Sequence, residues 1–168
     1  IMLLLSTKVL AQETPKAELE AWRNIVVSYL QEGEAASAEW TPFCLVVAGT
    51  APSSSQVQQV KDAIARGDES SQTVTDLAKQ ILLASACGLD PTDVSGVNLL
   101  EKLFSQEQMD RQGSNGPIFA LLALDCKGYQ LPAGSSWTRE ALTELIISYQ
   151  REDGGFGLND RLESDVDV

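Results

Sequence analysis

The 168-residue sequence contains no histidine. This absence excludes Ser-His-Asp and Cys-His catalysis and any His-ligated metal site built from this chain alone. Cysteine is scarce as well: Cys44, Cys87 and Cys126 lie far apart and form no Cys-x-x-Cys pair, so a zinc knuckle is not expected. All three fall in apolar runs, where a free cysteine behaves as a small buried hydrophobic residue. Nothing in the sequence indicates that any two of them pair.

Basic residues are few. The chain has 12 Lys and Arg against 24 Asp and Glu, which gives a formal net charge of −12. The basic residues are scattered singly, without the clusters that phosphate binding needs. We therefore expect no nucleic-acid partner and interpret the acidic surface as an aid to solubility. No apolar run reaches the roughly 18 residues of a membrane span, so no transmembrane segment is expected.

Residues 1–12, IMLLLSTKVLAQ, allow two interpretations. The run Val-Leu-Ala before Gln12 fits a signal-peptidase site, and the leucines ahead of it fit the apolar part of a signal peptide. However, Lys8 interrupts the apolar run and no basic segment precedes it, so an amphipathic N-terminal helix is the alternative. Residues 13–168 have the length of one domain, or of part of one.

The sequence repeats at intervals of about 40 residues. Ile-Val-Val-Ser-Tyr at 25–29 matches Ile-Ile-Ser-Tyr at 146–149, at an offset of 120 residues between the tyrosines. Between these copies, Pro52, Pro91 and Pro132 follow three apolar stretches and lie 39 and 41 residues apart. Because 120 is three such periods, we predict αα-hairpin repeats.

Helical periodicity and capping residues predict an all-α fold. Amphipathic helices alternate with helices that are apolar on most sides. A helix that is apolar all round is buried and an amphipathic one lies outside, so the alternation predicts an inner and an outer layer, as in an α/α-toroid or an α-solenoid. The predicted helices cover residues 17–31, 41–48, 53–66, 73–87, 95–104, 118–126 and 136–150.

The segment 150–157, QREDGGFG, resembles the Gln-x-x-x-Gly-x-Trp repeat motif of the squalene cyclase and prenyltransferase superfamily of α/α-toroids, with Phe in the place of Trp. A complete toroid of this superfamily has more hairpins than this chain supplies. The resemblance therefore implies that residues 13–168 form the N-terminal half of a ring, with an uncovered apolar face on the last outer helix. It also implies a structural role, at the joint between two repeats, for Gln150, Asp153, Gly154, Gly155 and Phe156.

The acidic segment that follows resembles a catalytic motif. Asp165-Val166-Asp167 is similar to the start of the Asp-x-Asp-Asp motif of squalene–hopene cyclases, with Val168 in the place of the last Asp. If the chain is an enzyme, the resemblance implies that Asp167 is the catalytic acid and Asp165 its partner. Val168 leaves this assembly incomplete. Aromatic residues, which stabilise carbocations in cyclase cavities, make up only 6% of the chain.

In an α/α-toroid, inner helices line the ligand cavity. The resemblance therefore implies cavity positions near the starts of the inner helices. Two of these residues have a plainer interpretation: an acid at position 76 would cap its helix, and residue 115 would simply start one. The candidates are Trp40, Phe43, Asp76, Asn115 and Phe119.

Two further likenesses point away from catalysis. Ser-Asp-Val-Asp at 164–167 is similar to a segment of intrinsic factor and transcobalamin, non-catalytic toroids that carry cobalamin. Over roughly residues 20–168, the chain is similar to toroid domains of secreted or cell-surface bacterial proteins.

These likenesses imply an extracellular or cell-surface domain that binds a small molecule, such as an isoprenoid or a corrinoid, and uses no cofactor. The prenyltransferase zinc site needs a histidine that is absent here. Two alternatives stay open: an enzyme of the terpene cyclase or prenyltransferase type, and a protein–protein interaction scaffold. The open face of a half ring also predicts self-association.

Overall fold

The computed structural model describes residues 15–67, 72–159 and 163–164. Within these ranges the chain is all-helical, as predicted, with no β-strand and one short 3₁₀ helix, η1. None of the described helices is long and apolar enough to cross a membrane. The elements in chain order are α1 (Lys16–Gln31), η1 (Ala35–Ser37), α2 (Thr41–Val47), α3 (Ser54–Ala65), α4 (Val74–Ala86), α5 (Leu99–Phe104), α6 (Asn115–Asp125) and α7 (Arg139–Ser148).

The largest departures from the predicted helix boundaries are at the starts of three helices. α5 begins four residues later than expected because Ser95 and Gly96 adopt φ angles of 54° and 83° in a tight turn, after which Asn98 caps the helix. α7 begins after Thr138, whose hydroxyl accepts a hydrogen bond from the Ala141 N–H at 3.1 Å. α6 begins three residues earlier than expected, ahead of its proline. In each case a local turn or cap sets the helix boundary. The spacing of apolar residues, from which the helices were predicted, contains no information about such turns and caps.

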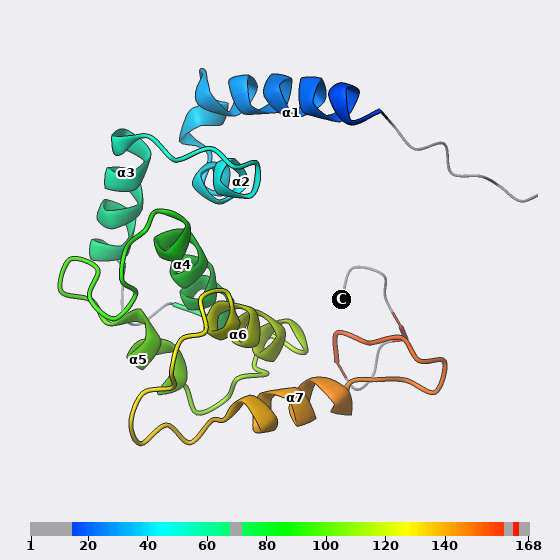
Figure 1. The fold of residues 1–168 in the computed structure, drawn as a ribbon. Helices are drawn as coiled ribbons and strands as arrows, with labels where there is room; N and C mark the ends of the chain where they lie inside the picture. Colours follow the sequence, from blue (N-terminus) through cyan, green and yellow to red (C-terminus); the bar gives the residue numbers. More distant parts are fainter. Residues whose placement is uncertain (1–14, 68–71, 160–162, 165–168) are drawn as a thin grey trace, which may run out of the picture.

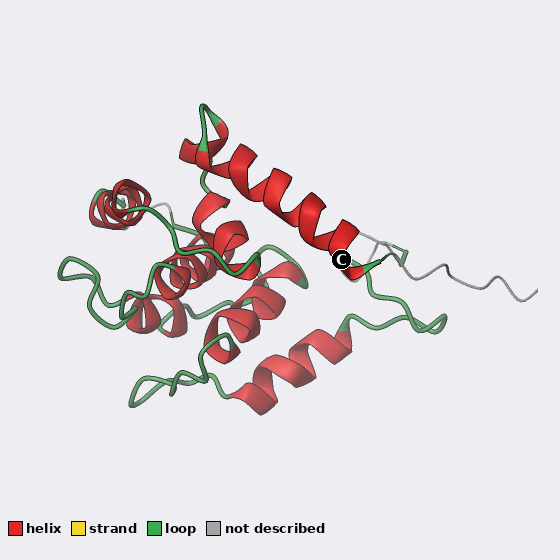
Figure 2. Ribbon diagram, turned by 45° about the horizontal axis from the view of Figure 1, so that its top comes forward, coloured by secondary structure: helices red, strands yellow, loops and turns green. Residues whose placement is uncertain are grey.

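The helices are arranged in two layers along a curved path (Figure 1). α2, α4 and α6 form the inner layer, in which α4 packs against both α2 and α6. On the outside, α3 and α5 pack against α4, α7 packs against α6, and α1 contacts η1 and α2. Both views place α1 at one end of this path and α7 at the other (Figures 1 and 2).

The core lies around α4 and α6. Ala78, Ile81 and Ala84 of α4 are fully buried, and the small residues Ala120 and Ala123 let α6 approach α4 closely. Side chains from α3, α5 and α7 complete the same cluster. α4 can therefore be apolar on most sides, because it has neighbours on most sides.

Some hydrogen bonds join side chains that are about 40 residues apart in the sequence. One example is the Lys79 ammonium, which donates to the Glu39 carboxylate, 40 residues earlier. Another joins the hydroxyls of Ser85 and Tyr129, 44 residues apart, at 2.8 Å. These two separations are close to the spacing of about 40 residues seen in the sequence.

The three cysteines are free. The expectation that all of them are buried is wrong for Cys44 and Cys126, which are exposed, while Cys87 is half-buried. Cys126 follows the last residue of α6, where the helix end leaves the core.

Candidate functional site

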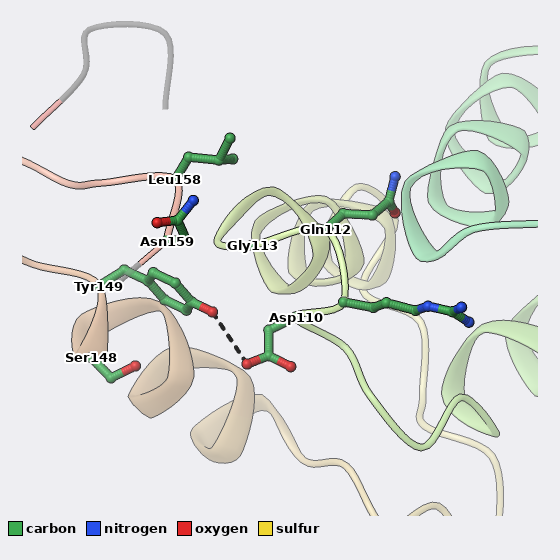
Figure 3. Close-up of a pocket in the computed structure, with 8 residues that line it drawn as sticks. Asp110, Gln112, Gly113, Ser148, Tyr149, Leu158 and Asn159 are labelled. Carbon is green, nitrogen blue, oxygen red and sulfur yellow. Dashed lines mark hydrogen bonds between the residues drawn. The ribbon is translucent and has the colours of Figure 1, made fainter. Parts of the chain in front are cut away.

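A pocket of about 700 Å³ opens where the segment before α6 meets the end of α7 and the chain that follows it (Figure 3). It draws its walls from three stretches that are far apart in the sequence. The volume falls within the range of about 300–1,000 Å³ typical of small-molecule sites. The lining residues are Asp110, Arg111, Gln112, Gly113, Ser148, Tyr149, Leu158 and Asn159.

The wall formed by residues 157–159 is fixed to the start of α6. The backbone N–H of Ser114 donates to the Leu158 carbonyl at 3.0 Å, and the buried Ser114 hydroxyl donates to the Gly157 carbonyl at 3.1 Å. Gly113 adopts a φ of +71°, and a Cβ at this position would lie 1.9 Å from the Leu158 carbonyl oxygen. Only glycine fits both the left-handed conformation and this close approach.

The turn after α7 contains the five residues expected at a repeat joint. Gln150 donates through its side-chain amide to the Gly154 carbonyl at 3.0 Å, and its backbone pairs with that of Phe156. Asp153 Oδ1 accepts hydrogen bonds from the Gly155 N–H at 2.9 Å and from the Ser164 hydroxyl at 2.7 Å. The Ser164 hydroxyl, followed by the Gly155 N–H, lowers the pKa of Asp153. These residues close the turn beside the pocket and do not line it.

Two hydrogen-bonded groups set the chemistry inside the pocket. The Tyr149 hydroxyl donates to Asp110 Oδ2 at 3.2 Å, which joins the end of α7 to the segment before α6 (Figure 3). Gln112 reaches the start of α4, where its side-chain oxygen accepts hydrogen bonds from the N–H and the hydroxyl of Thr75, at 3.2 and 3.1 Å. The oxygen of this amide is therefore committed to α4, and its NH₂ group is the part that can donate to a ligand.

A second pocket, of about 340 Å³, adjoins the first at the start of α4. The two pockets share Arg111 and Gln112. The second is lined mainly by glutamine side chains, and its lining residues are Gln72, Thr73, Val74, Gln106, Gln108, Arg111 and Gln112.

The aromatic and amide cavity candidates lie elsewhere. Trp40, which is 37% exposed, packs edge-to-face on Phe43 with ring centroids 5.7 Å apart. Phe43 and Phe119 are half-buried against the core, and Asn115 is the first residue of α6. None of these four residues lines either pocket.

Asp76 acts as a cap of α4. Its Oδ2 accepts hydrogen bonds from the N–H and the hydroxyl of Thr73, at 3.1 and 2.6 Å, and the Thr73 hydroxyl accepts in turn from the Asp76 N–H. The hydrogen bond from the Thr73 hydroxyl is the main cause that lowers the pKa of Asp76, and Lys79, 3.9 Å away, adds to it. The geometry accounts for this acid without a ligand.

The catalytic candidates Asp165 and Asp167 lie outside the described residues. Among the residues that the structure does describe, no three or more acidic or cysteine side chains gather as metal ligands would.

Most of the pocket residues were missed by sequence reasoning, which named none of Asp110, Arg111, Tyr149 and Asn159 as site residues and used Tyr149 only to mark the repeat. The spacing of about 40 residues could have indicated that two of these residues contact each other. Asp110 and Tyr149 are 39 residues apart, so their contact follows the same period as the other joints between hairpins.

Comparison with known proteins adds nothing to this picture: no family model, curated protein or solved structure matches the chain.

Proposed function

We propose that the chain is a non-catalytic helical-repeat domain of the α/α-toroid type, and that it binds a small molecule in the pocket between α6, α7 and residues 157–159. The observation that carries the proposal is the pocket itself, because its walls come from stretches far apart in the sequence and are joined by hydrogen bonds, among them the buried one from the Ser114 hydroxyl to the Gly157 carbonyl. Such a wall is preorganised, which reduces the ordering cost of binding.

The toroid type is supported by the two layers and by the joints. Outer helices flank an inner layer of α2, α4 and α6. Side-chain bonds recur at separations of 40 and 44 residues. An arrangement of this kind curves, and the curvature of helical repeats commonly produces a concave binding surface.

Binding is favoured over catalysis by the state of the polar groups. Asp110 and Tyr149 are hydrogen-bonded to each other. The Ser148 hydroxyl donates to the Leu145 carbonyl at 2.7 Å. Gln112 holds the start of α4. The described groups of the pocket that could serve as acid, base or nucleophile thus have structural partners.

A thermal-shift screen against corrinoids, isoprenoid diphosphates and squalene tests the proposal. A ligand at about 100 times its Kd should raise the Tm by about 5 °C or more. Ser148→Trp places an indole in the pocket from an exposed position and should abolish the shift. Ser105→Trp is the matched control, because Ser105 is also an exposed serine at a helix end whose hydroxyl donates to a carbonyl three residues back.

Two outcomes would contradict the proposal. If the shift persists unchanged in Ser148→Trp, the ligand binds elsewhere. If an isoprenoid substrate is converted to a product that the Ser148→Trp variant does not form, the pocket is catalytic.

A further inference from the structure

The second pocket differs from the rest of this acidic chain in its charge. The protein carries a net charge of −12, yet none of the described residues that line this pocket is acidic and one, Arg111, is a cation. Arg111 is exposed, and no described carboxylate lies within ion-pair distance of it. The pocket therefore combines a positive charge with neutral amides, in a chain whose net charge is strongly negative.

The side chains of this pocket offer hydrogen-bond donors to a ligand, because the acceptor oxygen of Gln112 is already used within the protein. Because the oxygen of Gln112 already accepts from Thr75, the group that it offers is an NH₂ with two donors. Arg111 adds the planar guanidinium, whose paired N–H groups match a carboxylate in a bidentate arrangement. An acceptor-rich group on a ligand would satisfy both side chains.

Two acids beside the lining residues, and the N–H groups at the end of the helix, already have hydrogen-bond partners. Asp76 is directed to the cap of α4 and pairs with Thr73 and Lys79. Asp110 faces the first pocket and accepts from Tyr149. At the start of α4 the N–H groups of Thr75 and Asp76 already have acceptors, so Arg111 and Gln112 supply the attraction.

We infer that the second pocket is an anion subsite that takes the carboxylate of a ligand whose remaining part lies in the first pocket. The inference rests on the proposed function, since it assigns a chemical class to the ligand of the same site. A carboxylate fits better than a phosphate dianion or a diphosphate because the pocket offers a single cation. Arg111 and Gln112 line both pockets, so a carboxylate bound by them lies where the two pockets adjoin.

Three sugars that share one ring provide the test: glucose is neutral, glucuronate carries a carboxylate and glucose 6-phosphate carries a phosphate. Each is titrated into the ¹⁵N-labelled full chain while the side-chain NH₂ signals of Gln112 and the Nε–H signal of Arg111 are followed. Glucuronate should shift both signals and bind at least about tenfold more tightly than glucose, the equivalent of about 1.4 kcal/mol. Added salt should weaken the binding of glucuronate.

Variants assign the effect to the guanidinium. Arg111→Gln should remove the preference for glucuronate over glucose, and Arg111→Lys should keep only part of it because a lysine lacks the bidentate fork. Arg23→Gln is the control. It removes a positive charge from the exposed surface of α1, outside both pockets, and should leave the preference for glucuronate over glucose intact. The dispersion of the amide spectrum reports whether each variant is folded.

The outcomes separate this inference from the proposed function. Equal binding of glucose and glucuronate, or an undiminished preference in Arg111→Gln, overturns the anion subsite. Tighter binding of glucose 6-phosphate than of glucuronate replaces the carboxylate by a phosphate and overturns the assignment made here. If none of the sugars shifts these signals while a ligand from the thermal-shift screen still loses its effect in Ser148→Trp, the subsite is wrong and the proposed function stands.

Discussion

The first and last outer helices, α1 and α7, match in sequence at an offset of 120 residues and have opposite surroundings. The 120-residue offset pairs Trp22 with Leu142 and Tyr29 with Tyr149. Leu142 is fully buried and Tyr149 is half-buried with its hydroxyl on Asp110. Trp22 and Tyr29 are 60% and 70% exposed, and α1 contains no buried residue.

The two helices differ in burial because they have different neighbours. The apolar stripe of α7 packs against α6, whereas α1 contacts η1 and the short helix α2 and buries none of its residues. The stripe itself is as apolar in α1 as in α7. A helical stripe therefore predicts which face of a helix can pack, while burial depends on whether a neighbour is there.

This comparison also modifies the half-ring expectation. The sequence predicted an uncovered apolar face on the last outer helix. Ile147 of α7 is 56% exposed, while Leu145 and Ile146 are half-buried. The larger uncovered face is at the opposite end of the array. It consists of Leu19, Trp22, Ile25, Val26 and Tyr29 of α1, each more than half exposed.

The largest expected effect comes from truncating the covered stripe. Leu142→Ala should lower the free energy of unfolding by roughly 4 kcal/mol, because it removes a fully buried side chain and leaves a cavity against α6. Leu19→Ala makes the same chemical change on the exposed stripe of α1, and should alter stability by less than about 0.5 kcal/mol. Urea denaturation at 25 °C measures both. Similar losses in the two variants would mean that the face of α1 is covered in solution, contrary to the structure.

The sequence predicts burial in α4 but does not predict exposure in α1. Both helices, and the alternation between them, follow from the spacing of apolar residues. The burial of Ile81 was predictable because α4 is apolar on most sides. The exposure of Trp22 was not, because its stripe has the same pattern as the stripe that buries Leu142, and only the presence of a neighbour distinguishes the two.

The candidate site was harder to predict than the fold. Its residues come from loops and helix ends, where hydrophobic periodicity carries no information, and they meet only when two repeats are joined. Asp76 looked like a cavity residue from its position, but its location three residues after Thr73 also fits a capping box, and the structure contains that box. Gly113 could be recognised as a turn residue, although its contact with Leu158 could not.

A second test compares glycines at the two ends of the array. Gly113→Ala should cost roughly 3 kcal/mol, because a residue with a Cβ is strained at a φ of +71° and the Cβ would also overlap the Leu158 carbonyl oxygen. Gly33, after α1, has a φ of +56° but no described atom within 4 Å of the added Cβ. Gly33→Ala should therefore cost only about 1–2 kcal/mol. Thermal and urea unfolding would rank the two, and equal losses would show that the contact with Leu158 is absent in solution.

The smallest effect concerns the turn that follows α7. The Ser164 hydroxyl and the Gly155 N–H donate to Asp153 and lower its pKa in the folded state. A group whose folded pKa is below its unfolded value of about 3.9 stabilises the fold above that pH. This contribution is lost as the pH falls through the folded pKa. Stability measured from about pH 5 down to about pH 2.5 should therefore decline less steeply in Asp153→Asn than in the unmodified chain.

A carboxyl ¹³C titration assigns this effect to its cause. The Asp153 midpoint should lie below the ordinary value, and Ser164→Ala should raise it, since that change removes the largest of the lowering influences and leaves the Gly155 N–H in place. A midpoint at or above the ordinary value in the unmodified chain would show that the turn is open in solution. The end of the array at α7 would then lack the closure that distinguishes it from α1.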